Sequence, residues 1–139
     1  RQILYPMLEK NFRFKNANGI WAWSATKFMS QCKMIINQTL SNDLVNIRTF
    51  ETLGCRLPLI QNRCDVGVDQ DDNGLFDLFK DGEDMFTYAT FDEAIDKIKW
   101  MIEHFDKTLE VAANGFSKAI NKHAYANRVD TILKVTGLK

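Results

Sequence analysis

Segment 42–51 holds the residues whose types and order are best suited to bind an anion. It follows a short apolar run at 34–36, and Asn46 can act as the N-cap of the helix that comes next. The start of a helix presents unpaired backbone N–H groups and the positive end of the helix dipole, which suits a phosphate or diphosphate. We therefore expect the amides from Asn46 to Thr49 to face such a group, with Arg48 adding a positive charge.

Glu51 adds a carboxylate one turn further along this helix. A carboxylate there can accept two hydrogen bonds from the vicinal hydroxyls of a ribose, as the acidic residue of a dinucleotide site does. A loop, an arginine and a glutamate in this order fit a nucleoside diphosphate. On these residues alone, however, we favour a plain ion pair between Arg48 and Glu51, because residues three apart are neighbours on a helix surface.

Segment 63–84 is the most acidic part of the chain and is predicted to be a surface loop. Some of its residues occupy positions 1, 3, 5, 6 and 9 of an EF-hand calcium loop, namely Asp69, Asp71, Asn73, Gly74 and Asp77. Position 12, where such loops carry a bidentate Glu, is Lys80. We favour a solvated loop over a calcium site and treat the pair Asp69 and Asp71 as a chance D-x-D pattern, so no metal and no other cofactor is expected.

The two histidines, His104 and His123, each fall near a predicted helix end, where the dipole favours a cation. We predict a structural role for both rather than general-base catalysis. Tyr125 and Arg128 are predicted to tie the last helix to the core, although Arg128 could also reach a phosphate.

Trp21 and Trp23 lie next to a turn signal at 18–19. We assign them to the core and its rim, with a stacking platform for a nucleobase as the alternative.

The composition is that of one globular domain, with 139 residues, 45% hydrophobic and 26% charged. Eighteen basic and eighteen acidic residues cancel, which argues against binding of nucleic acid by bulk positive charge. The charge is unevenly spread, since residues 1–63 hold nine basic and three acidic residues. No run approaches the roughly 18 apolar residues of a membrane span. The first residue, Arg1, suggests a piece of a longer chain.

The cysteines are Cys32, Cys55 and Cys64, an odd number without a C-x-x-C pair or zinc-ligand spacing. Reduced thiols in a cytoplasmic protein are the simplest interpretation.

Hydrophobic periodicity and end signals predict a series of elements along the chain. We expect helices at 2–12, 21–32, 47–53, 91–105, 106–120 and 125–133, and strands at 12–14, 34–36, 58–60 and 87–88. Gly54 is expected to end the helix at 47–53 by adopting the left-handed conformation. Thr90 and Glu93 form a capping box, and Asp106 is expected to cap the helix after it.

The alternation of helices and strands predicts an α/β fold, a Rossmann-like doubly wound parallel sheet with helices on both faces and a helical C-terminus. The whole of 1–139 is expected to form this single domain. Ligands of such folds bind at the carboxyl ends of the strands, which directs attention to the loop and helix start at 37–48.

Three ordered motifs carry a resemblance to a known family: R-x-F-E (Arg48, Phe50, Glu51), L-F-x-x-G-x-[ED] (78–84) and H-x-Y-x-N-R (His123, Tyr125, Asn127, Arg128). With their surroundings they cover about 30–133. This part of the chain resembles the C-terminal, donor-binding half of GT-B-fold glycosyltransferases, and most closely the glycosyl-transferase-like domain that also occurs in spore-maturation proteins.

The resemblance implies that Glu51 holds the ribose of a nucleotide sugar and that the preceding loop and helix start hold its diphosphate. Many retaining members carry another carboxylate eight residues earlier, and Asp43 occupies that position, which implies a catalytic role. The implied donor-binding residues are Asn46, Arg48, Thr49 and Glu51. Such enzymes bind the acceptor between two halves, so the chain is expected to be a fragment inactive alone, lacking an N-terminal acceptor domain. The alternative is a non-catalytic nucleotide-sugar-binding or interaction module.

Overall fold

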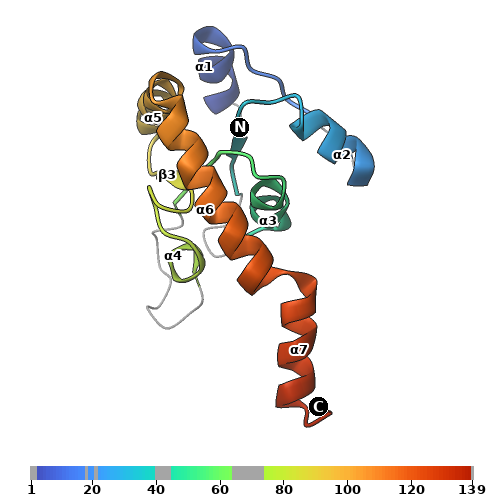
Figure 1. Cartoon of the computed structure of the whole chain (residues 1–139). Coiled ribbons are helices and arrows are strands. Elements are labelled where there is room, and N and C mark those ends of the chain that lie inside the picture. The colour runs from blue at the N-terminus through green and yellow to red at the C-terminus, as the bar shows by residue number, and fades with distance from the viewer. Residues whose placement is uncertain (1–2, 18, 21, 40–44, 64–73, 139) are drawn as a thin grey trace.

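The computed structural model describes residues 3–17, 19–20, 22–39, 45–63 and 74–138 (Figure 1). Its elements, in chain order, are α1 (Leu4–Asn11), α2 (Ala22–Met29), β1 (Ile35–Asn37), α3 (Ile47–Gly54), β2 (Leu59–Asn62), α4 (Leu75–Leu78), β3 (Phe86–Tyr88), α5 (Phe91–Glu103), α6 (Phe105–His123) and α7 (Tyr125–Val135). Within these residues the strands form one parallel sheet in the order β1-β2-β3. The predicted α/β fold with helices on both faces and a helical C-terminus is confirmed.

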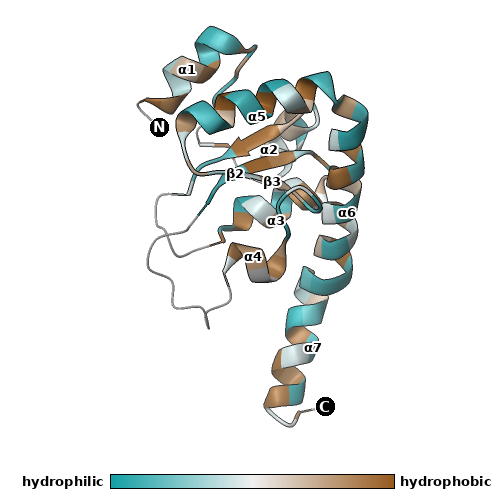
Figure 2. Cartoon of the chain, turned by 90° about the vertical axis from the view of Figure 1, so that its left-hand side faces the viewer, coloured by the Kyte–Doolittle hydropathy of each residue, from teal (hydrophilic) through white to brown (hydrophobic). Residues whose placement is uncertain are grey.

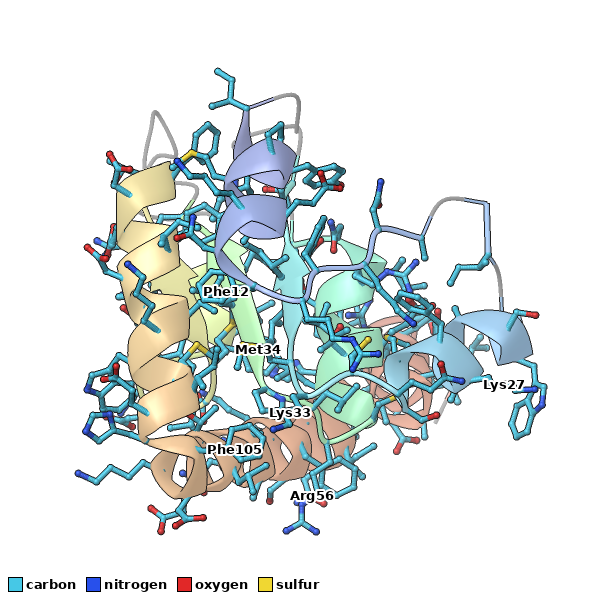
Figure 3. The ribbon with its side chains drawn as sticks, turned by 90° about the horizontal axis from the view of Figure 1, so that it is seen from above. Phe12, Lys27, Lys33, Met34, Arg56 and Phe105 are labelled. Atoms are coloured by element: carbon cyan, nitrogen blue, oxygen red, sulfur yellow. The ribbon has the colours of Figure 1, made fainter. Side chains whose placement is uncertain are left out.

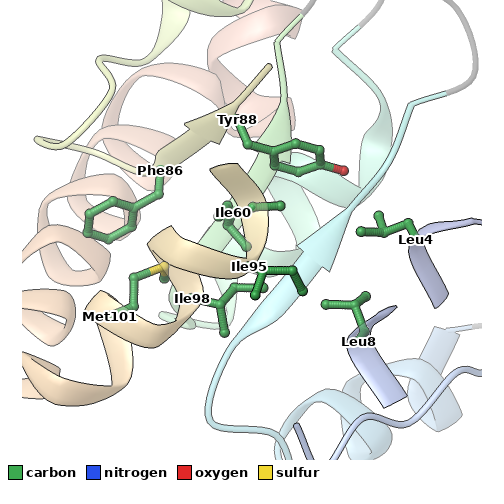
Figure 4. Packing of buried hydrophobic residues seen from close by; sticks show 9 residues of the cluster. Leu4, Leu8, Ile60, Phe86, Tyr88, Ile95, Ile98 and Met101 are labelled. Carbon is green, nitrogen blue, oxygen red and sulfur yellow. The ribbon is translucent and has the colours of Figure 1, made fainter. Parts of the chain in front are cut away.

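Alternate residues of the strands face two separate apolar layers. Ile60 and Phe86 face α1 and α5, where they pack with Leu4, Leu8, Tyr88, Ala94, Ile95, Ile98 and Met101 (Figure 4). Leu59 and Met85 face the other way, toward α3, α4 and α6, where they pack with Leu53, Leu75, Phe79 and Ala119. The period of two along each strand thus divides the core between the two faces of the sheet. Figure 2 shows α5 above the sheet and α3 and α4 below it.

The start of α3 was predicted correctly, but its end differs from the prediction. Asn46 is the N-cap of α3, as predicted. The left-handed residue after α3 is Arg56, with φ 56°, not Gly54, which remains helical. Arg56 N–H bonds Leu53 C=O and Leu57 N–H bonds Thr52 C=O, so the end is a Schellman motif with arginine at the left-handed position.

The capping box of α5 is shifted by one residue. Thr90 Oγ1 accepts from Glu93 N–H at 3.2 Å, as predicted. The Glu93 carboxylate accepts from Ala89 N–H at 2.7 Å rather than from Thr90 N–H. It is also paired with Arg63 at 2.6 Å, which joins the end of β2 to the start of α5.

Three predicted features of the chain are wrong. Segment 12–14 is not a strand, because Phe12 N–H caps α1 on Leu8 and Phe14 N–H bonds back to Phe12 C=O. The segment 63–84 is not loop throughout, since its described part contains α4, anchored by buried Leu75 and Phe79. Asp106 does not cap α6, whose N-cap is His104, without a capping side chain.

The buried face of α6 is formed by small residues. Its buried residues are Thr108, Ala112, Gly115 and Ala119, whereas Leu109 and Ile120 are exposed. A Cβ at Gly115 would lie 2.1 Å from the carbonyl oxygen of Asp84. Small side chains let α6 approach the backbone, and that contact decides which face is buried.

α7 extends away from the rest of the molecule beyond the end of α6 (Figures 1 and 2). None of its residues is buried. No helix within the described ranges is long and apolar enough to cross a membrane.

Candidate functional site

The first turn of α3 sits at the carboxyl ends of β1 and β2, and a hydrogen-bond network fixes it there. Asn37, the last residue of β1, donates through Nδ2 to Asn46 Oδ1 and to Gln61 Oε1, both at 2.9 Å. Thr49 Oγ1 donates to the same Gln61 oxygen at 2.6 Å. Asn37, Thr49 and Gln61 are buried. Because a buried polar group without a partner is costly, these bonds set the position of α3 over the sheet.

The side chains of Asn46 and Thr49 therefore form hydrogen bonds inside the protein and hold the start of α3 in place. Asn46 Oδ1 accepts from Thr49 N–H at 3.3 Å in addition to its bond from Asn37. The Thr49 hydroxyl is fully buried against Gln61. The backbone N–H groups of Ile47 and Arg48 precede the first intrahelical donor, so they remain directed out of the helix start.

Arg48 and Glu51 lie on the outer side of the same turn. Arg48 Nη1 is 3.0 Å from Glu51 Oε2, and the two side chains are 37% and 38% exposed. The surface ion pair weighed in the sequence analysis is thus formed. Glu51 Oε2 has no hydrogen-bond partner in the described part of the chain, so the contact has the distance of an ion pair without hydrogen-bond geometry.

A second polar contact secures the chain just after β1. Thr39 N–H donates to Asn62 Oδ1 at 2.7 Å, and Thr39 Oγ1 donates to the same oxygen at 3.1 Å. Asn62 is the last residue of β2, so this contact and the Asn37–Gln61 contact join neighbouring strand ends twice. Sequence reasoning missed both contacts, although Asn37 and Gln61 directly follow the predicted strands at 34–36 and 58–60.

The outer end of α3 is tied to α7 through Phe50. The Arg128 guanidinium lies 4.9 Å from the Phe50 ring centre, which confirms the predicted link to the core. Tyr125 is 75% exposed and makes no such link within the described ranges, so its predicted part in tying the last helix to the core is wrong. The His123 ring packs 5.3 Å from Phe79, and burial, helped by the charge of Arg128, lowers the pKa of His123. His123 therefore favours the neutral form, not the cation that the helix end alone predicts.

His104 stacks on Trp100 at 4.6 Å between ring centres, and its Nδ1 lies 3.0 Å from the Trp100 carbonyl oxygen. These contacts fit the structural role predicted for it. Trp23 is 82% exposed, so its assignment to the core and rim is wrong. The described thiols, Cys32 and Cys55, are free, and burial raises the pKa of each.

Several candidate residues lie outside the described ranges: Asp43, Trp21, Cys64, Asp69, Asp71 and Asn73. The calcium-loop pattern thus remains a sequence pattern, with its position 9, Asp77, inside α4. Within the described ranges, no three His, Cys, Asp or Glu side chains are grouped where they could hold a metal ion.

Comparison with known proteins assigns a family to nearly the whole chain. Residues 5–134 match the family described as glycosyl transferase-like. No curated protein matches the chain.

Proposed function

The chain belongs to the glycosyl transferase-like family, and from this we propose that it binds a nucleoside-diphosphate sugar at the start of α3 for transfer of the sugar to an acceptor. One observation carries the proposal. The network of Asn37, Asn46, Thr49 and Gln61 holds a helix N-terminus at the carboxyl edge of a parallel sheet. That edge is where ligands of such folds bind.

Each proposed donor-binding residue then has a distinct role. The N–H groups of Ile47 and Arg48, with the Arg48 guanidinium, bind the diphosphate, and the Glu51 carboxylate accepts from the ribose hydroxyls. Asn46 and Thr49 act as positioning residues, because their side chains are engaged within the network. Donor binding replaces the Arg48–Glu51 ion pair, since each member gains a ligand group of suitable chemistry.

As the sugar leaves, negative charge develops on the diphosphate. Donors already fixed at the helix start stabilise that charge without reorganising during the reaction. Asp43 remains the proposed catalytic carboxylate, eight residues before Glu51. We also propose that the acceptor is bound by polypeptide outside these residues, and that the protein is cytoplasmic, with Cys32 and Cys55 reduced.

A calorimetric titration with UDP-glucose, GDP-mannose and ADP-glucose tests donor binding. We expect one of these donors to bind the unaltered chain. The same donor should bind Arg48→Gln and Glu51→Gln roughly tenfold or more weakly, because the loss of a charge-assisted hydrogen bond is of this size. Asp96→Asn is the matched control, because Asp96 and Lys99 also form an exposed i,i+3 pair. If none of the donors binds the folded protein, the donor assignment is wrong. If the full-length protein binds a donor but does not transfer its sugar to an acceptor, the alternative of a non-catalytic binding module would be favoured.

A further inference from the structure

Three motifs that lie far apart in the sequence meet in one aromatic cluster beside α3. Phe50 belongs to R-x-F-E on α3, Phe79 to L-F-x-x-G-x-[ED] after α4, and His123 to H-x-Y-x-N-R at the end of α6. The ring centres of Phe50 and Phe79 are 5.8 Å apart, those of Phe50 and His123 are 5.9 Å apart, and those of Phe79 and His123 are 5.3 Å apart. Each ring therefore contacts the other two.

This cluster holds α3 from a side that the polar network over the sheet does not reach. Thr49 is fully buried against the sheet, whereas the next residue, Phe50, packs against the junction of α6 and α7. The Arg128 guanidinium of α7 covers the Phe50 ring at 4.9 Å. Figure 3 shows α6 running from Phe105 past α3, which ends just before Arg56. The helix of the proposed donor site is thus fixed from two sides.

His123 is the member of the cluster that can change its charge near neutral pH. Its Nε2 atom is buried and has no hydrogen-bond partner in the part of the chain that the structure describes. Lys118 and Lys122 of α6 and Arg128 of α7 place three positive charges around the ring. Burial, helped by these charges, lowers the pKa of His123 and outweighs the preference of a helix end for a cation.

The carboxylates of the packed elements are paired with other residues. Asp84, in the turn after α4, is 2.7 Å from Lys118, and Glu51 of α3 is 3.0 Å from Arg48. Within the described ranges, no carboxylate forms an ion pair with His123. A proton added to this ring is therefore repelled by the nearby cations and gains no counter-charge.

We propose that His123 is a positioning residue for the donor site: its neutral ring holds Phe50, and its protonation in mildly acidic solution loosens α3 and weakens donor binding. The ligand in this inference rests on the proposed function, whereas the contact between His123 and α3 does not. Phe50 lies between Thr49 and Glu51 in the chain, so a shift of Phe50 displaces the turn that we assign to the diphosphate and ribose.

The direction of the pH effect follows from linkage between the proton and the conformation of α3. When α3 is loosened, His123 regains its ordinary pKa, so the proton favours the loosened form. The contact is fully formed above the ordinary pKa and is lost as pH falls through the lowered one. Because linkage is reciprocal, donor binding should in turn shift the titration of His123 to lower pH.

Hydrogen exchange of the α3 amides tests the contact without any ligand. His123→Phe keeps an aromatic ring against Phe50 and Phe79 but cannot take up a proton. His104→Phe is the matched control, because His104 is the other histidine of the chain and stacks on Trp100 just before α6 begins.

Between pH 7.5 and pH 5, we expect the protection of the α3 amides to fall about fivefold or more in the unaltered chain and in His104→Phe. Protection in His123→Phe should stay the same. A fall of equal size in His123→Phe, or constant protection in the unaltered chain, would overturn the proposal.

Calorimetric titration at the same two pH values extends the test to the donor that binds among UDP-glucose, GDP-mannose and ADP-glucose. The unaltered chain and His104→Phe should bind it about fivefold or more weakly at pH 5, and His123→Phe should bind it equally at both. His123→Ala should bind weakly at both pH values, because the ring itself is lost.

The two measurements separate failure of this inference from failure of the donor assignment. If a donor binds the unaltered chain equally at both pH values, or if His123→Phe keeps the pH dependence of the unaltered chain, His123 does not position the donor site. If no donor binds, the donor assignment is wrong, and the exchange measurement alone decides whether His123 holds α3.

Discussion

The hydroxyl of Thr49 donates a 2.6 Å hydrogen bond to the side-chain oxygen of Gln61, which joins the first turn of α3 to the end of β2. Both residues are fully buried. The same Gln61 oxygen accepts from Asn37 at the end of β1. One glutamine thus links both strand ends to the helix start that we propose as the donor site.

Replacing Gln61 should destabilise the fold. Gln61→Leu removes the 2.6 Å acceptor of the Thr49 hydroxyl and one of the two acceptors of the Asn37 amide, which keeps its bond to Asn46. Because the Thr49 hydroxyl is fully buried, we expect a loss of about 1–3 kcal/mol in the free energy of unfolding, measured by urea denaturation. The control Gln31→Leu changes an exposed glutamine and should shift stability by no more than about 0.5 kcal/mol. Equal stability of Gln61→Leu and the unaltered chain would show that the network does not hold α3.

Gly115 should tolerate no side chain. In Gly115→Ala the new Cβ would meet the Asp84 carbonyl oxygen at 2.1 Å, so α6 must shift away from the turn after α4. Overpacking of this kind costs about 1–3 kcal/mol, readable as a lower midpoint of chemical denaturation. Glu110→Ala, at an exposed position of the same helix, is the control. A stabilised Gly115→Ala would contradict the close approach of α6.

Glu93 should make stability depend on pH in the acid range. The Ala89 N–H, followed by Lys97 and Arg63, lowers the pKa of Glu93 below its ordinary value. The folded state therefore binds the proton less readily than the unfolded state, so this contribution is present at neutral pH and is lost as pH falls through the folded-state pKa.

Urea denaturation at pH 7 and pH 3 checks this sign. Glu93→Gln should reduce stability at pH 7 and should differ less from the unaltered chain at pH 3, where the carboxylate is increasingly protonated. Glu110→Gln serves as the exposed control. A difference between Glu93→Gln and the unaltered chain that grows toward acid would contradict the assignment.

Arg128 should stabilise the junction between α3 and α7. Arg128→Ala removes the cation from the Phe50 ring, a contact worth about 0.5–1 kcal/mol at an exposed site. We expect a loss of this size in thermal unfolding and a smaller loss in Arg128→Lys, which keeps the charge. Lys122→Ala is the control on the last turn of α6. Equal losses in Arg128→Ala and Lys122→Ala would rule out a specific contact with Phe50.

The sequence predicted the elements whose signals are local. The α3 start followed from Asn46, and the α5 start from Thr90 and Glu93, because each capping contact spans only three residues. The strand at 34–36 lies one residue from the observed β1. Apolar periodicity located α5, whose buried residues are Ala94, Ile95, Ile98 and Met101.

The features that escaped prediction depend on contacts between distant parts of the chain. The buried face of α6 is decided by the approach of Gly115 to Asp84, which hydrophobicity does not report. The polar network joins Asn37 and Gln61 across 24 positions, and nothing in either residue type distinguishes it from a loop residue. Arg56 adopts the left-handed conformation because the hydrogen bonds that end α3 require it at that position, although Gly54 lies only two residues earlier.

The candidate site, too, was predicted only in part from the sequence. Arg48 and Glu51 stood out in the sequence by charge and spacing, and the structure places them on one exposed turn. That Asn46 and Thr49 face inward followed only from the contacts with Asn37 and Gln61.

We propose above all that the start of α3 binds the diphosphate and ribose of a sugar nucleotide. The most direct measurement is a calorimetric comparison of the unaltered chain with Arg48→Gln and Glu51→Gln, titrated with the donor that binds best. We expect both variants to bind this donor roughly tenfold or more weakly, while Asp96→Asn binds it like the unaltered chain. Full affinity in both variants, with their folding intact, would contradict it.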